Sequence, residues 1–231
     1  MAQFFMPMAT NDFVGIDENP LSENGMWIPN TALSGRMKRQ SNTAVFTANL
    51  DSVTIYNKFL PANQYAQAQF SCVGTTGTGD GPALVLRCAS PTVNTCYRFA
   101  LDHSATNAEI SRFANGSFIP LAQAVVTFND KDTFTFAMQN QVCFVYRNGV
   151  QVMTYDDTAG SGPTAGFAGI GFSFPETSIV IRQFECGAFS SQGFSQQEIN
   201  SGIQEFNLFK RNLIALQTND RSLNIAALGS R

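Results

Sequence analysis

Short segments in which apolar and polar residues alternate recur through the middle of this chain, about every ten residues. The clearest is AQAQFSC (66–72), where Ala, Ala, Phe and Cys alternate with Gln, Gln and Ser. A period of two is that of a β-strand with one buried face. Further strands are predicted at 83–89, 96–101, 109–113, 117–121, 133–138, 141–146, 151–155, 166–174, which is glycine-spaced, and 178–186. Many short strands between about residues 36 and 188 predict a β-sandwich or a closed barrel.

Turn sequences separate these segments. Asn115-Gly116 and Asn148-Gly149 each stand between two of them. Asn-Gly readily adopts the positive φ that both central positions of a type I′ turn require, so each pair predicts a tight β-hairpin. Residues 90–94 (SPTVN) form a further cluster of turn residues.

The composition excludes several classes of protein. Of 231 residues, 44% are hydrophobic, 13% are charged and 21 are Phe, which argues against disorder. The net charge of −3 argues against a nucleic-acid-binding protein. No segment approaches the roughly 20 apolar residues of a membrane-spanning helix, and the N-terminus lacks the basic and apolar regions of a signal peptide. We therefore expect a protein made in the cytoplasm and not exported by that route, with no nucleic-acid or membrane partner.

Catalytic chemistry has little support in the sequence. The one histidine, His103, stands between Asp102 and Ser104, and neighbours on a strand point to opposite faces, so these residues do not form a triad. A glycoside hydrolase needs a pair of carboxyl groups that project into one cleft. The acids considered for this role, none of which completes such a pattern, are Asp130, Asp132, Asp156, Asp157, Glu176 and Glu185. We expect no enzyme activity, and a sandwich-fold glycoside hydrolase is the weakest alternative.

No cofactor or metal site is predicted. The five cysteines show no CxxC spacing for zinc, and the Gly-rich segment 74–81 lacks the Lys-Ser/Thr ending of a phosphate-binding loop. Asp80 and residues 11–17 contain possible calcium ligands, but without a recognised ligand spacing. We expect buried free thiols. The alternative is a disulfide between Cys88 and Cys96 across a hairpin.

A helix is predicted near the C-terminus. Ser195 and Glu198 have the spacing of a capping box, and the helical pattern continues to about Gln217. Its apolar residues follow a heptad, the spacing of a helix that packs on a like helix. Packing on the protein's own sandwich is the alternative. The residues expected to form an assembly face are Ile199, Ile203, Phe206, Phe209, Leu213 and Leu216.

The N-terminal part resembles a known family. Residues 11–13 (NDF), residues 17–21 (DENPL) and then Trp27 resemble the opening of concanavalin A-like (LamG-like) jelly-roll domains seen in bacteriophage structural proteins. Residues 64–68 (QYAQA), the Asn148-Gly149 turn and residues 184–187 (FECG) resemble later parts of these domains. Gly15 departs from the pattern, because an Arg is common there in the family.

The resemblance covers about residues 11–188 and implies a mainly β, two-sheet antiparallel jelly-roll sandwich. It divides the chain into an N-terminal arm and first strand region (1–35), the jelly-roll domain (11–188), and a linker, amphipathic helix and tail (189–231). It places no catalytic residues on this sequence.

The resemblance implies two kinds of function. In phage particles such domains are capsid decoration (cement), tail or fibre components, and in lectins they bind carbohydrate. The leading hypothesis is a non-enzymatic virion structural protein that forms a homo-oligomer, with a trimer favoured, and contacts other virion proteins. The alternative is a lectin-like module for host adhesion, with Asp80, Tyr97 and Tyr155 as glycan contacts. Trp27, the one tryptophan, is expected to pack in the core.

Overall fold

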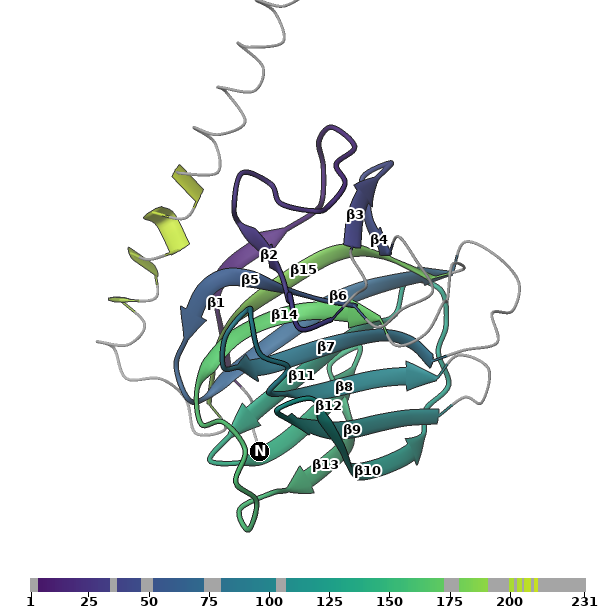
Figure 1. The fold of residues 1–231 in the computed structure, drawn as a ribbon, viewed down its shortest axis with the longest axis vertical. Coiled ribbons are helices and arrows are strands. Elements are labelled where there is room, and N and C mark those ends of the chain that lie inside the picture. Colours follow the sequence, from purple (N-terminus) through teal and green to yellow (C-terminus); the bar gives the residue numbers. More distant parts are fainter. Residues whose placement is uncertain are drawn as a thin grey trace, which may run out of the picture.

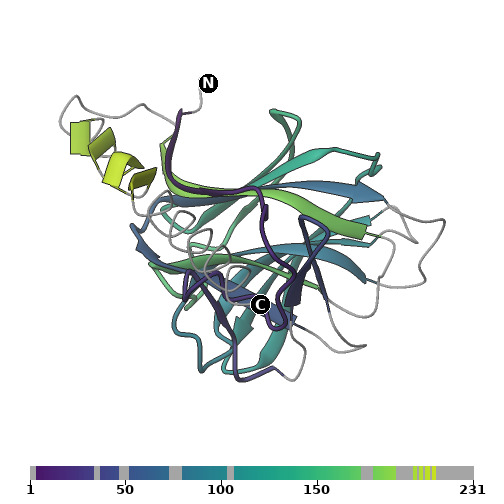
Figure 2. The same ribbon diagram turned by 90° about the horizontal axis from the view of Figure 1, so that it is seen from above.

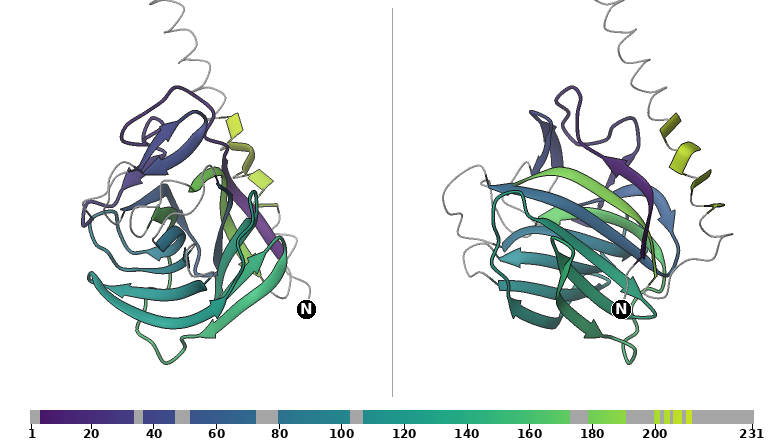
Figure 3. Two further views of the ribbon diagram at one scale, coloured as in Figure 1. Left: turned by 90° about the vertical axis from the view of Figure 1, so that its right-hand side faces the viewer. Right: turned by 180° about the vertical axis from the view of Figure 1, so that it is seen from behind.

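The chain forms two antiparallel β-sheets that face each other across a hydrophobic core (Figures 1 and 3). The computed structural model describes residues 4–33, 37–46, 52–72, 80–102, 107–172 and 179–190, and the helical positions 200–201, 203–204, 206–208 and 210–211. Within these residues the fold is a mainly β, two-sheet sandwich with one short helix, as predicted.

Sheet A has eight strands in the order β13-β12-β11-β6-β15-β4-β3, and β1 also pairs with β15. The bounds are β1 Phe4–Asn11, β3 Met37–Gln40, β4 Thr43–Phe46, β6 Gln64–Cys72, β11 Thr133–Gln139, β12 Val142–Arg147, β13 Val150–Asp156 and β15 Ile179–Ser190. Sheet B has seven strands in the order β10-β9-β8-β7-β14-β5-β2. Its strands are β2 Trp27–Pro29, β5 Ser52–Leu60, β7 Asp80–Cys88, β8 Cys96–Asp102, β9 Asn107–Ala114, β10 Ser117–Val125 and β14 Gly166–Phe172.

Each alternating segment of the sequence contains a strand, whereas β1 has no such pattern. The sequence of β1, FFMPMATN, becomes a strand by pairing with β15 from Phe4↔Ser190 to Asn11↔Phe184 (Figure 2). Strand β15 itself continues to Ser190, beyond residue 186 where its pattern ends. Long-range pairing therefore adds an edge strand to sheet A next to the site described below.

Both predicted hairpin turns are present. Asn115 and Gly116 have φ of 50° and 84°, and Asn148 and Gly149 have φ of 50° and 80°. These positive values at both central positions are those of the type I′ turn.

The core is built by the inward side of each strand. Phe70, Phe99, Phe134 and Phe136 are all fully buried, and their ring centroids lie 5.6–6.2 Å apart in the pairs they form. Trp27, 1% exposed, stacks on Phe13 at 5.7 Å, which confirms its predicted role in the core.

The cysteines that the structure describes are free and buried: Cys88, Cys96, Cys143 and Cys186. Cys88 and Cys96 lie on neighbouring strands β7 and β8 without a disulfide. Burial raises the pKa of the Cys143 thiol to about 12. Free thiols, the preferred hypothesis, are confirmed for these four residues.

The predicted helix is present where the structure describes it, at positions between 200 and 211. Ile203 and Leu208 are 53% and 59% exposed there, so the sandwich does not bury them. A third predicted assembly residue, Phe206, is half-buried beneath Lys210. The remaining ones fall outside the described residues: Ile199, Phe209, Leu213 and Leu216. No described helix is long and apolar enough to cross a membrane.

Candidate functional site

Polar side chains form two rows across the outer face of sheet A, the face turned away from the core. The register aligns the first row across four strands, β1, β15, β6 and β11: Thr10, Glu185, Gln67 and Thr135. The second row lies beside it on β15, β6 and β11: Gln183, Gln69 and Thr133. We call these seven residues the polar rows. Their side chains point outward because successive side chains of a strand point to opposite faces, and the intervening residues, such as Ala66 and Ala68, fill the core.

Hydrogen bonds orient the two central side chains of the first row. Thr135 Oγ1 donates to Gln67 Oε1 at 2.7 Å, so Gln67 keeps its Nε2 hydrogens for another acceptor. Tyr65 donates its hydroxyl to Glu185 Oε1 at 2.5 Å. Among the described residues, Glu185 Oε2 has no hydrogen-bond partner, and neither have the side-chain amides of Gln69 and Gln183. The rows thus present a donor and an acceptor side by side on adjacent strands.

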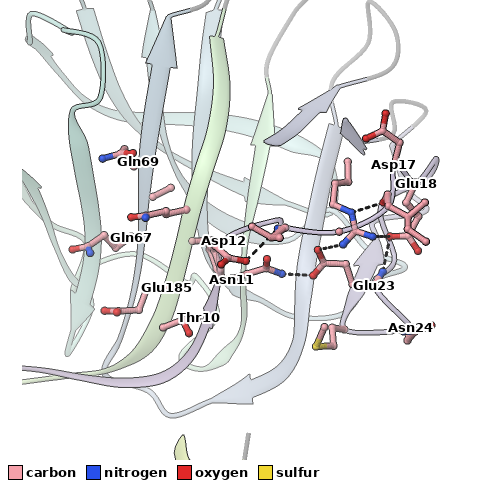
Figure 4. Close-up of a pocket in the computed structure, with 18 of the residues that line it drawn as sticks. Thr10, Asn11, Asp12, Asp17, Glu18, Glu23, Asn24, Gln67, Gln69 and Glu185 are labelled. Atoms are coloured by element: carbon pink, nitrogen blue, oxygen red, sulfur yellow. Dashed lines mark hydrogen bonds and ion pairs between the residues drawn. The ribbon is translucent and has the colours of Figure 1, made fainter. Parts of the chain in front are cut away.

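The polar rows, apart from Thr135, form the floor of an open hollow of about 1230 Å³. It lies where the edge of β15 changes partner, from β1 at Asn11↔Phe184 to β4 at Ile181↔Ala44. The chain after β1 leaves the sheet at this point, and residues 12–24 form the opposite wall. Figure 4 shows Gln67, Gln69 and Glu185 on one side of the hollow and Glu18 and Glu23 on the other.

A buried ion pair holds this wall. Arg39 on β3 contacts Glu23 Oε1 at 2.6 Å and Glu18 Oε2 at 3.9 Å, and its Nε donates to the Ile16 carbonyl at 2.7 Å. Trp27 Nε1 donates to Glu23 Oε2 at 3.1 Å, and Asn11 Nδ2 donates to the same oxygen. Three residues of the N-terminal segments that resemble the family, Asn11, Glu18 and Trp27, therefore contact the pair of Glu23 and Arg39 in this wall.

The departure at Gly15 has a structural explanation. A Cβ on Gly15 would lie 2.9 Å from the Arg39 guanidinium, so a side chain at this position would require the guanidinium to shift away from its partners on the wall. An arginine guanidinium therefore does lie beside position 15, but it belongs to Arg39 of β3.

An aromatic cluster borders the polar rows. Phe5 on β1 is 36% exposed and lies with its ring centroid 5.0 Å from that of Tyr65, 5.9 Å from Tyr146 and 5.3 Å from Phe189. Tyr65 joins the cluster to the rows through its bond to Glu185. The outer face of sheet A is thus apolar at one end and rich in amides and carboxylates at the other.

Burial raises the pKa of the Glu185 carboxyl above its ordinary value, while the hydrogen bond from Tyr65 acts in the opposite direction. Burial and the nearby Glu185 also raise the pKa of Tyr65, which keeps its hydroxyl a donor at neutral pH. Glu185 is therefore the half-buried ionisable group at the centre of the rows.

The glycan contacts predicted from sequence do not gather in the hollow. Tyr97 is fully buried and donates its hydroxyl to Asp157 Oδ2 at 2.6 Å beneath Gly162, so its prediction as a contact is wrong. Tyr155 is half-buried against the core on edge strand β13. Asp80 begins β7 in sheet B, and its side chain lies outside the described residues.

Two of the acids considered for hydrolysis are held in ion pairs. Asp132 contacts Arg147 at 2.7 Å and Asp157 contacts Arg112 at 2.8 Å. His103, Glu176 and the Gly-rich segment before Asp80 fall outside the described residues. Among the residues that the structure describes, no group of three or more His, Cys, Asp or Glu side chains is placed to hold a metal ion.

Comparison with solved structures identifies the fold. A carbohydrate-binding module, CBM66 from Bacillus subtilis, matches with a TM-score of 0.55 and 14% identity, over 71% of this chain and 93% of the module. The exoplasmic/lumenal domain of VIP36, in a form bound to Ca²⁺ and Man2, also has a TM-score of 0.55, with 13% identity over 84% of this chain and 92% of that domain. The fold is a concanavalin A-like jelly-roll sandwich.

An enzyme shares this fold as well. A glycoside hydrolase family 16 endo-glucanase from Bacteroides ovatus has a TM-score of 0.52 and 9% identity, over 78% of this chain and 99% of the enzyme. The sequence matches no protein-family model, and no curated protein is similar to it in sequence. These comparisons support the jelly-roll part of the resemblance, whereas its bacteriophage part stays a prediction.

Sequence reasoning missed the site although it contained one signal. Gln67 and Gln69 are the polar side of the clearest alternating segment, but an exposed strand face is usually polar. Glu185 stands out in the sequence as one of several acids and as part of the FECG segment, and neither feature predicts a binding role. Nothing local predicts that Glu185 lies beside Gln67, because the two residues meet only through the pairing of β15 with β6.

Proposed function

We propose that this chain is a lectin-like, carbohydrate-binding module that holds a saccharide in the hollow on the outer face of sheet A. The observation that carries the proposal is the neighbouring pair of Gln67 and Glu185, whose Nε2 donor and Oε2 acceptor both face the hollow without a partner among the described residues. The similar solved carbohydrate-binding domains support the proposal at the level of the fold.

The chemistry of the rows suits a sugar ring. Each sugar hydroxyl both donates and accepts a hydrogen bond, and amides and carboxylates offer the complementary atoms. One hydroxyl can donate to Glu185 while its neighbour accepts from Gln67, with Gln69 and Gln183 available to further hydroxyls. The hollow, about 1230 Å³, exceeds the roughly 300–1,000 Å³ of small-ligand pockets, so it accommodates more than one ring.

The arrangement favours binding over hydrolysis. A glycosidase needs two carboxyl groups across the scissile bond, about 5–5.5 Å or about 6.5–9.5 Å apart according to its stereochemistry. Within the polar rows, which the structure describes completely, Glu185 is the one carboxylate. Of the other carboxylates that line the hollow, Glu18 and Glu23 hold Arg39, and Asp12 and Asp17 accept hydrogen bonds from backbone amides. We therefore assign no catalytic role to the hollow.

The test is a glycan array followed by titration calorimetry on the best ligand. Replacing both Gln67 and Gln69 by Ala removes two hydrogen-bond partners of the ligand. We expect this double variant to lose about 1.4 kcal/mol of binding free energy, which corresponds to tenfold weaker binding. The matched control is Gln123→Ala, an exposed amide on β10 of sheet B, which should leave the affinity unchanged. Absence of binding across the array, or equal affinity in the double variant, would contradict the proposal.

A virion role is compatible with this function, since a protein on the surface of a particle can also contact glycans. That prediction rests on the resemblance over residues 11–188 and on the C-terminal helix rather than on the hollow.

A further inference from the structure

The hollow concentrates the negative charge of the molecule. Five carboxylate side chains and one guanidinium line it, whereas the whole chain has a net charge of −3. The carboxylates are Asp12, Asp17, Glu18, Glu23 and Glu185. The rest of the protein is therefore close to neutral, and the field at the hollow comes from its own lining.

Arg39 does not neutralise the floor of the hollow. Its guanidinium is bound to Glu23, Glu18 and the Ile16 carbonyl, all on the wall. Arg182 on β15 does not line the hollow, and its Nε donates to Ser71 Oγ at 2.8 Å.

The remaining carboxylates have neutral partners. Asp12 Oδ1 accepts from the Val14 amide at 3.2 Å, and Asp17 Oδ1 accepts from the Ser41 amide at 2.8 Å. Glu185 accepts from the Tyr65 hydroxyl, which leaves its charge uncompensated at the centre of the floor.

We propose that Glu185 determines the specificity of this site, so that the hollow takes uncharged saccharides and rejects acidic ones such as uronates. This inference rests on the proposed carbohydrate-binding function. Glu185 Oε2 accepts a hydrogen bond from a sugar hydroxyl but repels a carboxylate or sulfate at the same place. Asp12 and Asp17 on the wall add to the repulsion, because a cleft lined by charges of one sign excludes ligands of that sign.

The experiment compares matched pairs of ligands. Tetrasaccharides of β-glucan, mannan and galactan are titrated into the protein, each beside a counterpart whose primary hydroxyls are oxidised to carboxylates. We expect a neutral member to bind and its uronate to bind at least about tenfold more weakly. Glu185→Gln keeps an acceptor for Tyr65 and should shrink this ratio, as should added salt in the parent protein.

The matched control is Glu109→Gln on β9 of sheet B, which removes the same charge outside the hollow and should leave the ratio unchanged. A uronate that binds as tightly as its neutral partner overturns the inference while the binding function stands. So does an unchanged ratio in Glu185→Gln. If no member of the panel binds, the inference and the proposed function fall together.

Discussion

At the scale of single residues, Glu185 combines two roles that conflict. Its carboxylate lines the hollow, yet the surrounding protein buries it enough to raise its pKa. Burial penalises the charged form, and one hydroxyl from Tyr65 offsets only part of that penalty. A carboxyl group whose pKa is raised by burial reduces the stability of the fold at neutral pH, where it is charged.

Replacing this carboxylate should therefore stabilise the protein in a pH-dependent way. Because the pKa of Glu185 is raised in the folded state, its favourable contribution is present below its ordinary value of 4.5 and is lost as the pH rises through the folded-state pKa. We expect Glu185→Gln to raise Tm at neutral pH, and the difference from the parent to close as the pH falls below 4.5.

Thermal unfolding across this pH range measures the effect. Asp156→Asn is the control of opposite sign, since hydrogen bonds from Thr158 lower the pKa of Asp156. A Tm difference for Glu185→Gln that does not change with pH would refute the assignment.

At the scale of elements, the site depends on a loop that has no regular secondary structure over most of its length. Residues 12–24 are tied to the hairpin of β3 and β4 by the pair of Glu23 and Arg39, whose side chains are 6% and 11% exposed. Backbone bonds between Glu18 and Arg39 in both directions, at 2.9 and 3.0 Å, reinforce this contact. A buried ion pair and two backbone hydrogen bonds thus attach the wall of the hollow to this hairpin.

Breaking that pair should be costly. Glu23→Ala leaves the Arg39 guanidinium without its closest partner in a buried position, so we expect a loss of about 3–5 kcal/mol in the free energy of unfolding. Glu109→Ala removes the ion pair of Glu109 with Arg98, at 3.6 Å on sheet B. The Glu109 side chain is more exposed than that of Glu23, so we expect a smaller loss in the free energy of unfolding, about 0–1 kcal/mol. Urea unfolding of both variants provides the comparison, and equal losses would argue against a structural role for the wall.

At the scale of the whole molecule, the sandwich and the helix present different surfaces. The sandwich carries a polar hollow, whereas the helix leaves Ile203 and Leu208 more than half exposed. Helices with exposed apolar residues and a heptad pattern pack on partners. The proposed assembly through the helix can therefore be tested separately from the proposed ligand binding on sheet A.

The assembly prediction concerns the full-length chain. We expect light scattering to give an oligomer, with a trimer favoured, and Phe206→Asp combined with Leu213→Asp to give a monomer, because the new charges would fall in the apolar seam. The control pair, Gln204→Asp and Asn207→Asp, lies outside the heptad seam and should leave the mass unchanged. An unaltered oligomer in the seam variant, or a monomeric parent, would count against the helix as an assembly device.

Local patterns explain the part of the fold that was predictable. Alternation predicts strands such as β6 and β11 because neighbouring side chains on a strand must enter different environments. Asn115-Gly116 and Asn148-Gly149 predict hairpins because Asn and Gly adopt positive φ more readily than other residues. These signals lie within a few residues of one another, so no knowledge of the rest of the chain is needed.

The polar rows depend on contacts between distant segments. Tyr65 and Glu185 are 120 residues apart, and the polar rows exist only because β1, β15, β6 and β11 pair in one register. Tyr97 illustrates the same dependence in reverse, because Asp157 and Gly162 from a later loop cover it. The period of a strand says which side chains share a face, but which strand lies beside it, and what covers that face, follows from packing across the whole molecule.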